Sequence, residues 1–371
     1  MVAALLGPSL PDLAEQTSVR LKQVSLLFSS SYLGYMLGAL VGGHLYDRRF
    51  GHPLMAFALL LMSVTVALAP LTSQLVLLAL VILFVGISQG IMEVGGNTLI
   101  VWLHREKVGP FMIALHLFWG IGNIISPILI AQSRLITGSF ALAFWVISGL
   151  LLPVAFFLTR YPGPTSPSQE EDPQSRKPVQ WRLVILFMLF FLTFTGVEGA
   201  YGGWIYSYSI NTGIATEVFA AYLTSAYWGA LTFSRLISIP LSLRFRPLTL
   251  LIVDLIGCLV GLTIAVMGEG SPTMIWLATI ILGASIGTMF PLGITYASEI
   301  ITVTGQFTSL IIVGVSLGGM LIPWVIGQFF ETTGPQTTMW ILLGISILST
   351  LIFAILVSLK NRVSLPHQSS S

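Results

Sequence analysis

Charged residues are scarce in this chain. Only 8% of its 371 residues are Asp, Glu, Lys or Arg, whereas 55% are hydrophobic, and the mean hydropathy is +0.92. Water-soluble domains carry about 25% charged residues, so water cannot be the solvent for most of the surface. The composition therefore predicts a protein embedded in a lipid bilayer.

Several chemical signatures are also missing. Cys258 is the single cysteine, which excludes a disulfide framework and the Cys/His spacing of zinc sites. No glycine-rich phosphate loop is present, so nothing supports ATP as an energy source, and no residues are arranged as in a hydrolytic triad. We expect no enzymatic activity, no metal centre and no cofactor. The net charge of +2 gives no indication of nucleic-acid binding.

Long apolar runs recur between short polar breaks. A membrane-spanning helix needs about 20 apolar residues, whereas strands of a membrane barrel are segments of about 10. The runs match the helix, which predicts an all-α, polytopic membrane protein. The predicted spans are 24–45, 53–71, 75–101, 109–132, 139–159, 182–207, 216–240, 247–267, 272–298, 306–330 and 336–358.

The first residues resemble the end of a further span. The apolar stretch from Met1 to Gly7 precedes Pro8 and Pro11, a pattern typical of the last turn or two of a helix. A signal peptide would have a basic start and a small-residue cleavage site, and neither is present. We expect an incomplete first helix whose beginning is absent.

Basic residues concentrate in alternate loops. Cytoplasmic loops of membrane proteins are enriched in Lys and Arg. One side of the predicted topology holds Arg20, Lys22 and Arg134. The other side, with the C-terminus, holds Arg48, Arg49, Arg105, Lys107, Arg160, Arg176, Lys177, Arg182, Arg244, Arg246, Lys360 and Arg362. The asymmetry predicts a cytoplasmic C-terminus and a plasma or inner membrane location.

A polar segment divides the chain. Residues 161–181 are rich in Pro and Ser and contain clustered charges, which predicts a flexible cytoplasmic linker. It separates an N-terminal half-bundle (1–160) from a C-terminal half-bundle (182–360), and a cytoplasmic tail follows (361–371). Counting the incomplete helix, each half has six spans.

The two halves share a repeated pattern. Small residues are common wherever membrane helices pack closely, but that does not explain a shared register. The pairs at offsets of 195 to 197 are Ser30/Ser225, Tyr32/Tyr227, Gly34/Gly229, Gly86/Gly283, Ser88/Ser285, Gly90/Gly287, Met92/Met289, Gly96/Gly293, Gly122/Gly318 and Pro127/Pro323. Because six spans per half keep both halves in one orientation, the repeat predicts parallel halves related by an axis along the membrane normal, the architecture of major facilitator transporters.

A short motif carries a further likeness. The segment GHLYDRRFG at residues 43–51 resembles the major facilitator superfamily signature of Gly, three residues, Asp-Arg, and then a nearby Gly and basic residue. Here Gly51 comes one residue late, and His52 replaces the usual Arg or Lys. The resemblance implies that Asp47 and Arg48 belong to a gate, although ordinary interfacial charge would also explain them.

Other segments resemble one branch of that superfamily, the fucose/glucose symporters that include sodium-dependent glucose transporter-like proteins. The segments are LGPSLPD (6–12), EVGGN (93–97), Leu115-His116 with Gly120, Gly122 and Pro127, EGAYGGWI (198–205), and GVSLG (314–318) with Pro323-Trp324. The resemblance implies uptake of a hexose or similar polyol, driven by H⁺ or Na⁺.

Acidic residues within the spans are candidates for ion coupling. A carboxylate near the bilayer centre is costly. Glu93 lies in the middle of its span, and Gln89 and Asn97 stack on the same helix face at four-residue spacing. This polar face must contact protein or water. We predict that Glu93 couples an ion to the solute and that Gln89 and Asn97 bind the solute; a structural hydrogen bond between helices is the alternative.

Glu198 shares its span with Tyr201 and Trp204, and Tyr227 and Trp228 occupy the next span. Sugars require acceptors for their hydroxyl groups and flat rings for their C–H faces, and these residues offer both. We predict that Glu198 acts in ion coupling and that the four aromatic residues bind the solute. Alternatively, Glu198 is a gate residue, and the aromatic side chains pack or anchor the helices, with Trp204 near the outer interface.

Four further polar residues lie within spans. His116 suits a sugar hydroxyl or a proton relay, and Asn123 follows two turns later. We predict both as solute ligands. A buried histidine whose hydrogen bonds are satisfied by a neighbouring helix would explain His116 almost as well. Arg235 and Asp254 lie near the ends of their spans, where gate or loop contacts are expected.

Together these patterns favour a secondary active transporter, acting as a monomer, that moves a small polar solute by alternating access. The solute is expected to be a sugar and the coupling ion H⁺ or Na⁺. The alternatives are a proton-coupled efflux antiporter for drugs or metabolites and a non-transporting membrane receptor.

Overall fold

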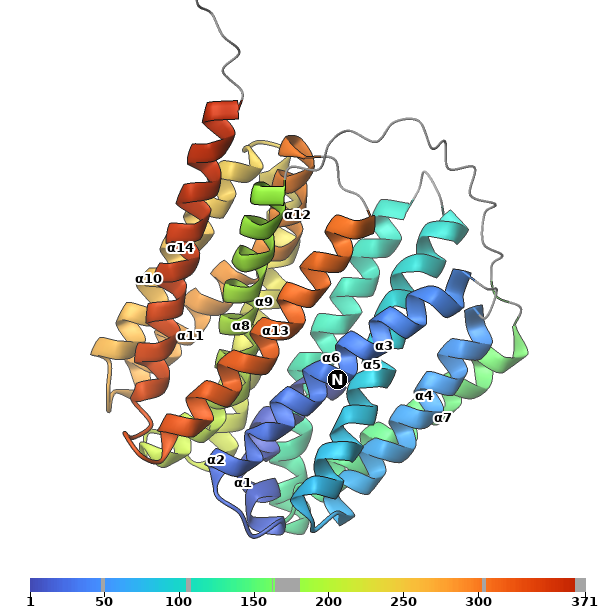
Figure 1. The fold of residues 1–371 in the computed structure, drawn as a ribbon. Helices are drawn as coiled ribbons and strands as arrows, with labels where there is room; N and C mark the ends of the chain where they lie inside the picture. Colours follow the sequence, from blue (N-terminus) through green and yellow to red (C-terminus); the bar gives the residue numbers. More distant parts are fainter. Residues whose placement is uncertain (48–50, 105–107, 162, 164–180, 302–304, 364–371) are drawn as a thin grey trace, which may run out of the picture.

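The computed structural model describes residues 1–47, 51–104, 108–161, 163, 181–301 and 305–363, and within these ranges the regular structure is entirely helical (Figure 1). The helices form two bundles that lie side by side. The N-bundle consists of η1 (Val2–Ala4), α1 (Leu6–Gln16), α2 (Leu21–Val24), α3 (Leu26–Asp47), α4 (Gly51–Leu68), η2 (Ala69–Leu71), α5 (Leu75–His104), α6 (Val108–Thr137) and α7 (Ala141–Arg160).

The C-bundle consists of α8 (Trp181–Asn211), α9 (Glu217–Ser242), α10 (Pro247–Met267), α11 (Pro272–Ile286), α12 (Met289–Ile300), α13 (Gly305–Phe330) and α14 (Thr337–Val363). We call the end of the molecule at which α7 ends and α8 begins the linker end, and we call the other end the opposite end. The boundary between the two bundles is the seam.

Ten helical segments of the described residues are long and apolar enough to cross a membrane. They coincide with ten of the predicted spans, which confirms the all-α polytopic fold. The remaining predicted span, 216–240, is the helix α9. It is as long as the others but more polar, because it carries several Ser and Thr residues and Arg235.

The first helix does not end where we predicted. Pro8 and Pro11 were expected to stop it at Gly7, but α1 continues through both to Gln16. Pro8 lies in the first turn, where its missing N–H costs no hydrogen bond. Pro11 frees only the carbonyl of Gly7, and Gly7 lies directly against the backbone of Gly202 in α8. Tertiary packing therefore maintains the helix past its prolines.

The predicted span 272–298 is likewise not one helix. It consists of α11 and α12, which are interrupted at Gly287 and Thr288. Pro291 explains the interruption, because proline has no N–H and its ring clashes with the carbonyl four residues earlier, that of Gly287. The equivalent position of the first half is Val94, and α5 is continuous there.

The internal repeat corresponds to equivalent packing in the two bundles. Gly86 of α5 lies against the carbonyl group of Ser31 in α3, and its counterpart Gly283 of α11 lies against the carbonyl group of Tyr227 in α9. A side chain at either glycine would separate the two backbones. The shared register thus reflects the same close helix pair built twice.

The helix pairs that join the bundles at the seam include α3 with α13, α6 with α9, α1 with α8, and α2 with α13. The following contacts between the bundles lie in the half of the seam that is nearer the opposite end. Ser29 donates to the carbonyl of Met320 at 3.1 Å, and Phe28 stacks near Trp204 with ring centroids 6.1 Å apart. At the tip, the amide of Leu21 donates to Glu331 at 3.0 Å. The bundles are therefore closed against each other at the opposite end.

We predict that Gly283→Ala destabilises the protein. A β-carbon at this position would lie 2.6 Å from the carbonyl oxygen of Tyr227, so α9 and α11 must move apart. Overpacking of this kind costs about 1–3 kcal/mol, and the thermal transition of the purified protein should fall. Gly344→Ala in α14, where nothing lies within 4 Å, is the matched control; equal effects would contradict the packing argument.

Candidate functional site

Arg235 connects four helices at the seam. Its Nη2 lies 3.9 Å from Oε1 of Glu198 in α8, and its Nε donates to the carbonyl oxygen of Gly287 at 2.8 Å. The guanidinium group also lies over the Trp119 ring of α6, 5.1 Å from its centroid. Gly287 is available as an acceptor because Pro291 cannot donate to it. Arg235 thus joins both bundles and the interruption between α11 and α12.

The pair of Arg235 and Glu198 is mostly but not fully buried. The exposed fractions of the two side chains are 21% and 14%. In such surroundings each charge is stabilised by its partner, because either one alone would be an uncompensated charge in a low-dielectric region. A solute or proton that binds one partner therefore changes the electrostatic stabilisation of the other.

Glu93, Asn97 and His116 are polar groups of the N-bundle, and one of them lies near this pair. Asn97 donates to Oε1 of Glu93 at 3.3 Å and to its carbonyl oxygen at 2.9 Å, as expected for residues on one face of α5. His116 of α6 lies within electrostatic range of both Glu93 and Arg235. His116 thus lies near charged groups of both bundles.

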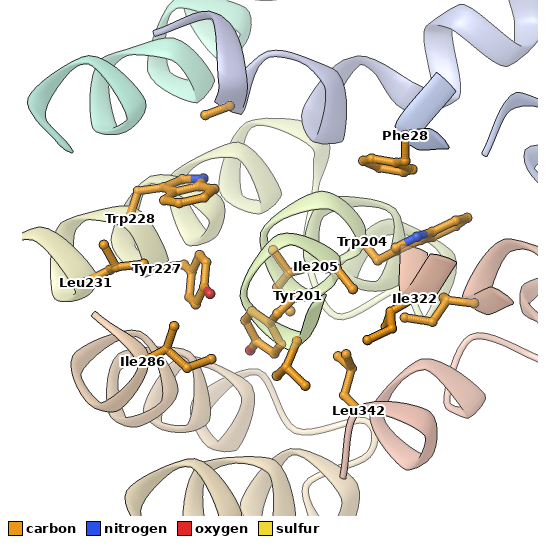
Figure 2. Close-up of a cluster of buried hydrophobic side chains, with 14 of the residues drawn as sticks. Phe28, Tyr201, Trp204, Ile205, Tyr227, Trp228, Leu231, Ile286, Ile322 and Leu342 are labelled. Carbon is orange, nitrogen blue, oxygen red and sulfur yellow. The ribbon is translucent and has the colours of Figure 1, made fainter. Parts of the chain in front are cut away.

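Aromatic side chains surround Glu198. The hydroxyl of Tyr227 donates to the carbonyl oxygen of Glu198 at 3.0 Å, and its ring lies 5.0 Å from that of Tyr201 and 5.2 Å from that of Trp228 (Figure 2). Trp228 also meets Trp119 of the other bundle edge to face at 5.8 Å. The Nε1 atom of Trp228 is buried but has no hydrogen-bond partner among the described residues.

The glycines of the segment EGAYGGW make room for these rings. A β-carbon on Gly199 would lie 2.6 Å from the Tyr32 hydroxyl, and one on Gly202 would lie 2.7 Å from the Trp228 ring. At Gly203 it would meet Phe28 at 2.6 Å. The motif therefore lets aromatic side chains of α3 and α9 approach the backbone of α8 at the seam.

Trp204 lies in the packed interior rather than at an interface with water. Its side chain has no exposed surface, and its Nε1 donates to the carbonyl of Pro323 at 3.0 Å. Its ring packs near that of Phe28 (Figure 2) and lies 4.7 Å from that of Phe330. The expectation that Trp204 lies near the outer interface is wrong, because the spacing along α8 did not reveal the helices packed on that face. Here it closes the seam.

The remaining residues predicted as solute ligands or gate residues lie in different parts of the bundles. Tyr201 is 1% exposed and shares a hydrogen bond with Thr279 at 2.8 Å. Asn123 is buried and accepts from the Met1 amino group at 3.3 Å. Gln89 is partly buried in α5. Asp47 ends α3, and Arg48 lies outside the described residues.

Arg235 and Asp254, the two residues near span ends, contact neighbouring helices. Arg235 pairs with Glu198, donates to Gly287 and lies over Trp119 of the other bundle, and Asp254 of α10 accepts from Thr288 at the interruption of α11 and α12. The gate or loop contacts expected of them stay a prediction. The prediction missed Trp119, which contacts Arg235 and Trp228. Its one available signal was its place one turn after His116 on α6.

A second charged cluster lies at the opposite end. Arg134 of α6 bonds Asp12 of α1, lies 3.7 Å from Glu217 of α9, and stacks on the Tyr206 ring of α8 at 4.9 Å. Its side chain is only 8% exposed. Since Arg134 and Asp12 belong to one bundle and the other two residues to the other, this cluster holds the opposite end closed.

These features define a class of protein: a membrane protein of two repeated helical bundles, with a charged and aromatic site at the seam and a closure at one end. The part of the chain that the structure describes contains no cluster of three His, Cys, Asp or Glu residues that could hold a metal ion. The family model of the Major Facilitator Superfamily matches residues 1–313. The chain belongs to this superfamily.

Similar proteins span nearly the whole chain. The sodium-dependent glucose transporter 1 of Xenopus laevis is 29% identical, over 97% of this chain and 79% of the relative. The sodium-dependent glucose transporter 1A of Mus musculus is 28% identical, over 97% and 93%. The xylose transporter XylE from E. coli, in a partially occluded inward-open conformation, has the same fold, with a TM-score of 0.76, 13% identity and coverage of 95% and 94%.

We predict that Arg134→Gln loosens the closure at the opposite end. The charge attractions to Asp12 and Glu217 are lost, so a thiol introduced as Gln132→Cys, in a Cys258→Ser background, should react faster with a membrane-impermeant maleimide. A tenfold faster reaction would correspond to about 1.4 kcal/mol in the equilibrium between closed and open forms.

The control for this experiment is Arg20→Gln, which removes an exposed charge at the same end and should leave the labelling rate unchanged. An unchanged rate in Arg134→Gln would show that the cluster does not hold the bundles together.

Proposed function

We propose that the chain is a secondary active transporter that moves a hexose or a closely related neutral sugar by alternating access, coupled to H⁺ or Na⁺. The relatives named as sodium-dependent glucose transporters support the sugar, because they align with almost the whole chain. The site supports it independently, since it offers hydroxyl acceptors and donors beside aromatic rings. No observation favours efflux by antiport or a receptor without transport.

The observation that carries the proposal is the place of the Glu198–Arg235 pair. The pair belongs to the C-bundle, yet Arg235 lies over Trp119 of the N-bundle. A solute that bonds Glu198 or stacks beside Trp119 would therefore contact both bundles. Binding energy at such a site depends on how the bundles are placed, which is the requirement for alternating access.

Coupling requires a carboxylate that an ion or proton can engage. In this proposal Glu93 of the N-bundle and Glu198 of the C-bundle are those carboxylates, and His116 lies within electrostatic range of Glu93 and Arg235. In this proposal an ion or proton at Glu93 changes the electrostatic field on His116 and Arg235. That change alters how firmly Arg235 holds Glu198, and so links ion occupancy to the solute.

Orientation in the membrane follows from the basic residues of the loops. Because Lys and Arg concentrate at the linker end, we propose that this end and the C-terminus are cytoplasmic, in the plasma or inner membrane. The closed opposite end would then face outward, and the conformation described here would be closed to the outside. We propose a monomer as the transporting unit, because each chain supplies both bundles.

We expect Glu93→Gln to reduce gradient-driven uptake of labelled glucose into proteoliposomes by about tenfold or more and to abolish its dependence on the imposed H⁺ or Na⁺ gradient, since the amide cannot carry the charge. A tenfold loss corresponds to about 1.4 kcal/mol of lost stabilisation. Uptake that survives with unchanged ion dependence would exclude Glu93 as the coupling residue.

Glu198→Gln should weaken solute binding as well as coupling, because the amide carries no charge and Arg235 loses the partner of its buried charge. Glu269→Gln, in the exposed turn between α10 and α11, is the matched control and should transport normally. Wild-type protein that accumulates no sugar under any of these gradients would contradict the proposed function.

A further inference from the structure

Tyr32 of α3 reaches from the N-bundle into the C-bundle. A β-carbon on Gly319 of α13 would lie only 2.2 Å from the Tyr32 ring, and one on Gly199 of α8 would lie 2.6 Å from the Tyr32 hydroxyl oxygen. We call the space that these two glycines leave the Tyr32 socket. Three residues earlier on α3, Ser29 donates to the carbonyl of Met320, the residue after Gly319, at 3.1 Å. This contact fixes the height of Tyr32 in the seam.

The Tyr32 hydroxyl meets α8 at the one accessible point of its inner part. From Thr193 to Ser209 every residue of α8 is buried except Glu198 and Gly199, which are partly exposed. Because α8 packs against α1, α9, α13 and α14, this exposed surface faces the interior of the protein. Tyr32 is itself partly exposed. A small molecule in the seam would therefore contact α8 beside the Tyr32 hydroxyl.

The hydrogen-bonding groups at this point are available to a solute. Within the described residues the Tyr32 hydroxyl makes no hydrogen bond, whereas its counterpart in the repeat, Tyr227, donates to the carbonyl oxygen of Glu198. The Glu198 carboxylate lies 3.9 Å from Arg235, which is longer than a hydrogen bond, so it can accept from a solute hydroxyl. Tyr32 lies within electrostatic range of Glu198. A tyrosine hydroxyl can both donate and accept.

We propose that Tyr32 is a specificity-determining residue, whose hydroxyl forms a hydrogen bond with one hydroxyl group of the sugar held at Glu198. This inference rests on the proposed function and adds a ligand from the N-bundle to a site whose carboxylate belongs to the C-bundle. A site built to bond a particular hydroxyl discriminates against the analogue that lacks it, because the protein group is then left unpaired. Tyr32 therefore selects among neutral sugars by one hydroxyl position.

The Tyr32 socket also relates this contact to the placement of the bundles. Both glycines of the socket belong to the C-bundle, and Tyr32 belongs to the N-bundle. Separation of the bundles at this height withdraws Tyr32 from Gly199 and from the neighbouring Glu198. A sugar that bonds both Tyr32 and Glu198 therefore binds more tightly to the form described here than to one opened at the opposite end, and it shifts the population towards the closed form.

The test is calorimetric titration of the full-length purified protein with glucose and with each monodeoxyglucose, at one pH and one NaCl concentration. Tyr32→Phe keeps the ring and removes only the hydroxyl, so we expect it to bind glucose about three- to tenfold more weakly than the wild type. One monodeoxyglucose should show a similar loss in the wild type and no further loss in Tyr32→Phe, because the same contact is already absent. Tyr161→Phe, an exposed tyrosine at the linker end, is the matched control and should bind every sugar as the wild type does.

Three results would overturn the inference about Tyr32 and leave the proposed function standing. Tyr32→Phe could bind glucose as tightly as the wild type, or it could lose the same factor for glucose and for every monodeoxyglucose. A large drop in its thermal transition temperature would show that the hydroxyl has a structural role. Wild-type protein that binds none of these sugars would instead contradict the proposed function, and the inference with it.

Discussion

The free carbonyl group of Gly287 organises the centre of this protein. Pro291 removes its helical donor, and Arg235 replaces that donor from a neighbouring helix. A guanidinium group held in this way has a fixed direction, and its remaining nitrogen atoms and its face meet Glu198 and Trp119. One proline thus determines where a buried positive charge lies, and the seam site is built around that charge.

Glycines bring the backbones and rings close enough for this arrangement. Gly283 lets α11 lie against α9, the helix that carries Arg235, and Gly202 lets Trp228 lie against α8. The N-bundle uses the same device at Gly86, but α5 is continuous and has no freed carbonyl at the equivalent point. The two repeated bundles therefore share their packing and differ in polarity at the seam. That asymmetry gives the C-bundle the Glu198–Arg235 pair.

Much of this arrangement could be predicted from the sequence, because hydropathy and repeated small residues depend on local chemistry. The spans, the repeat, and the Glu93–Asn97 face follow from spacing along one helix. The bond between Arg235 and Glu198 does not, since it depends on how α8 and α9 rotate about their axes. Trp119 and the interior place of Trp204 were missed for the same reason. Pro291 could have indicated the interruption, but the long apolar run of residues 272–298 led to the prediction of one continuous span.

The central claim is that the seam site links solute occupancy to the relative placement of two rigid bundles. Its most direct test is the distance between spin labels at Leu71→Cys and Met267→Cys, two exposed positions at the opposite end, one on each bundle, in a Cys258→Ser background. Addition of glucose with Na⁺ or at low pH should create a population with a longer distance in the wild type, and Arg235→Gln should suppress it. A distance distribution that does not respond to solute or ion would contradict the account.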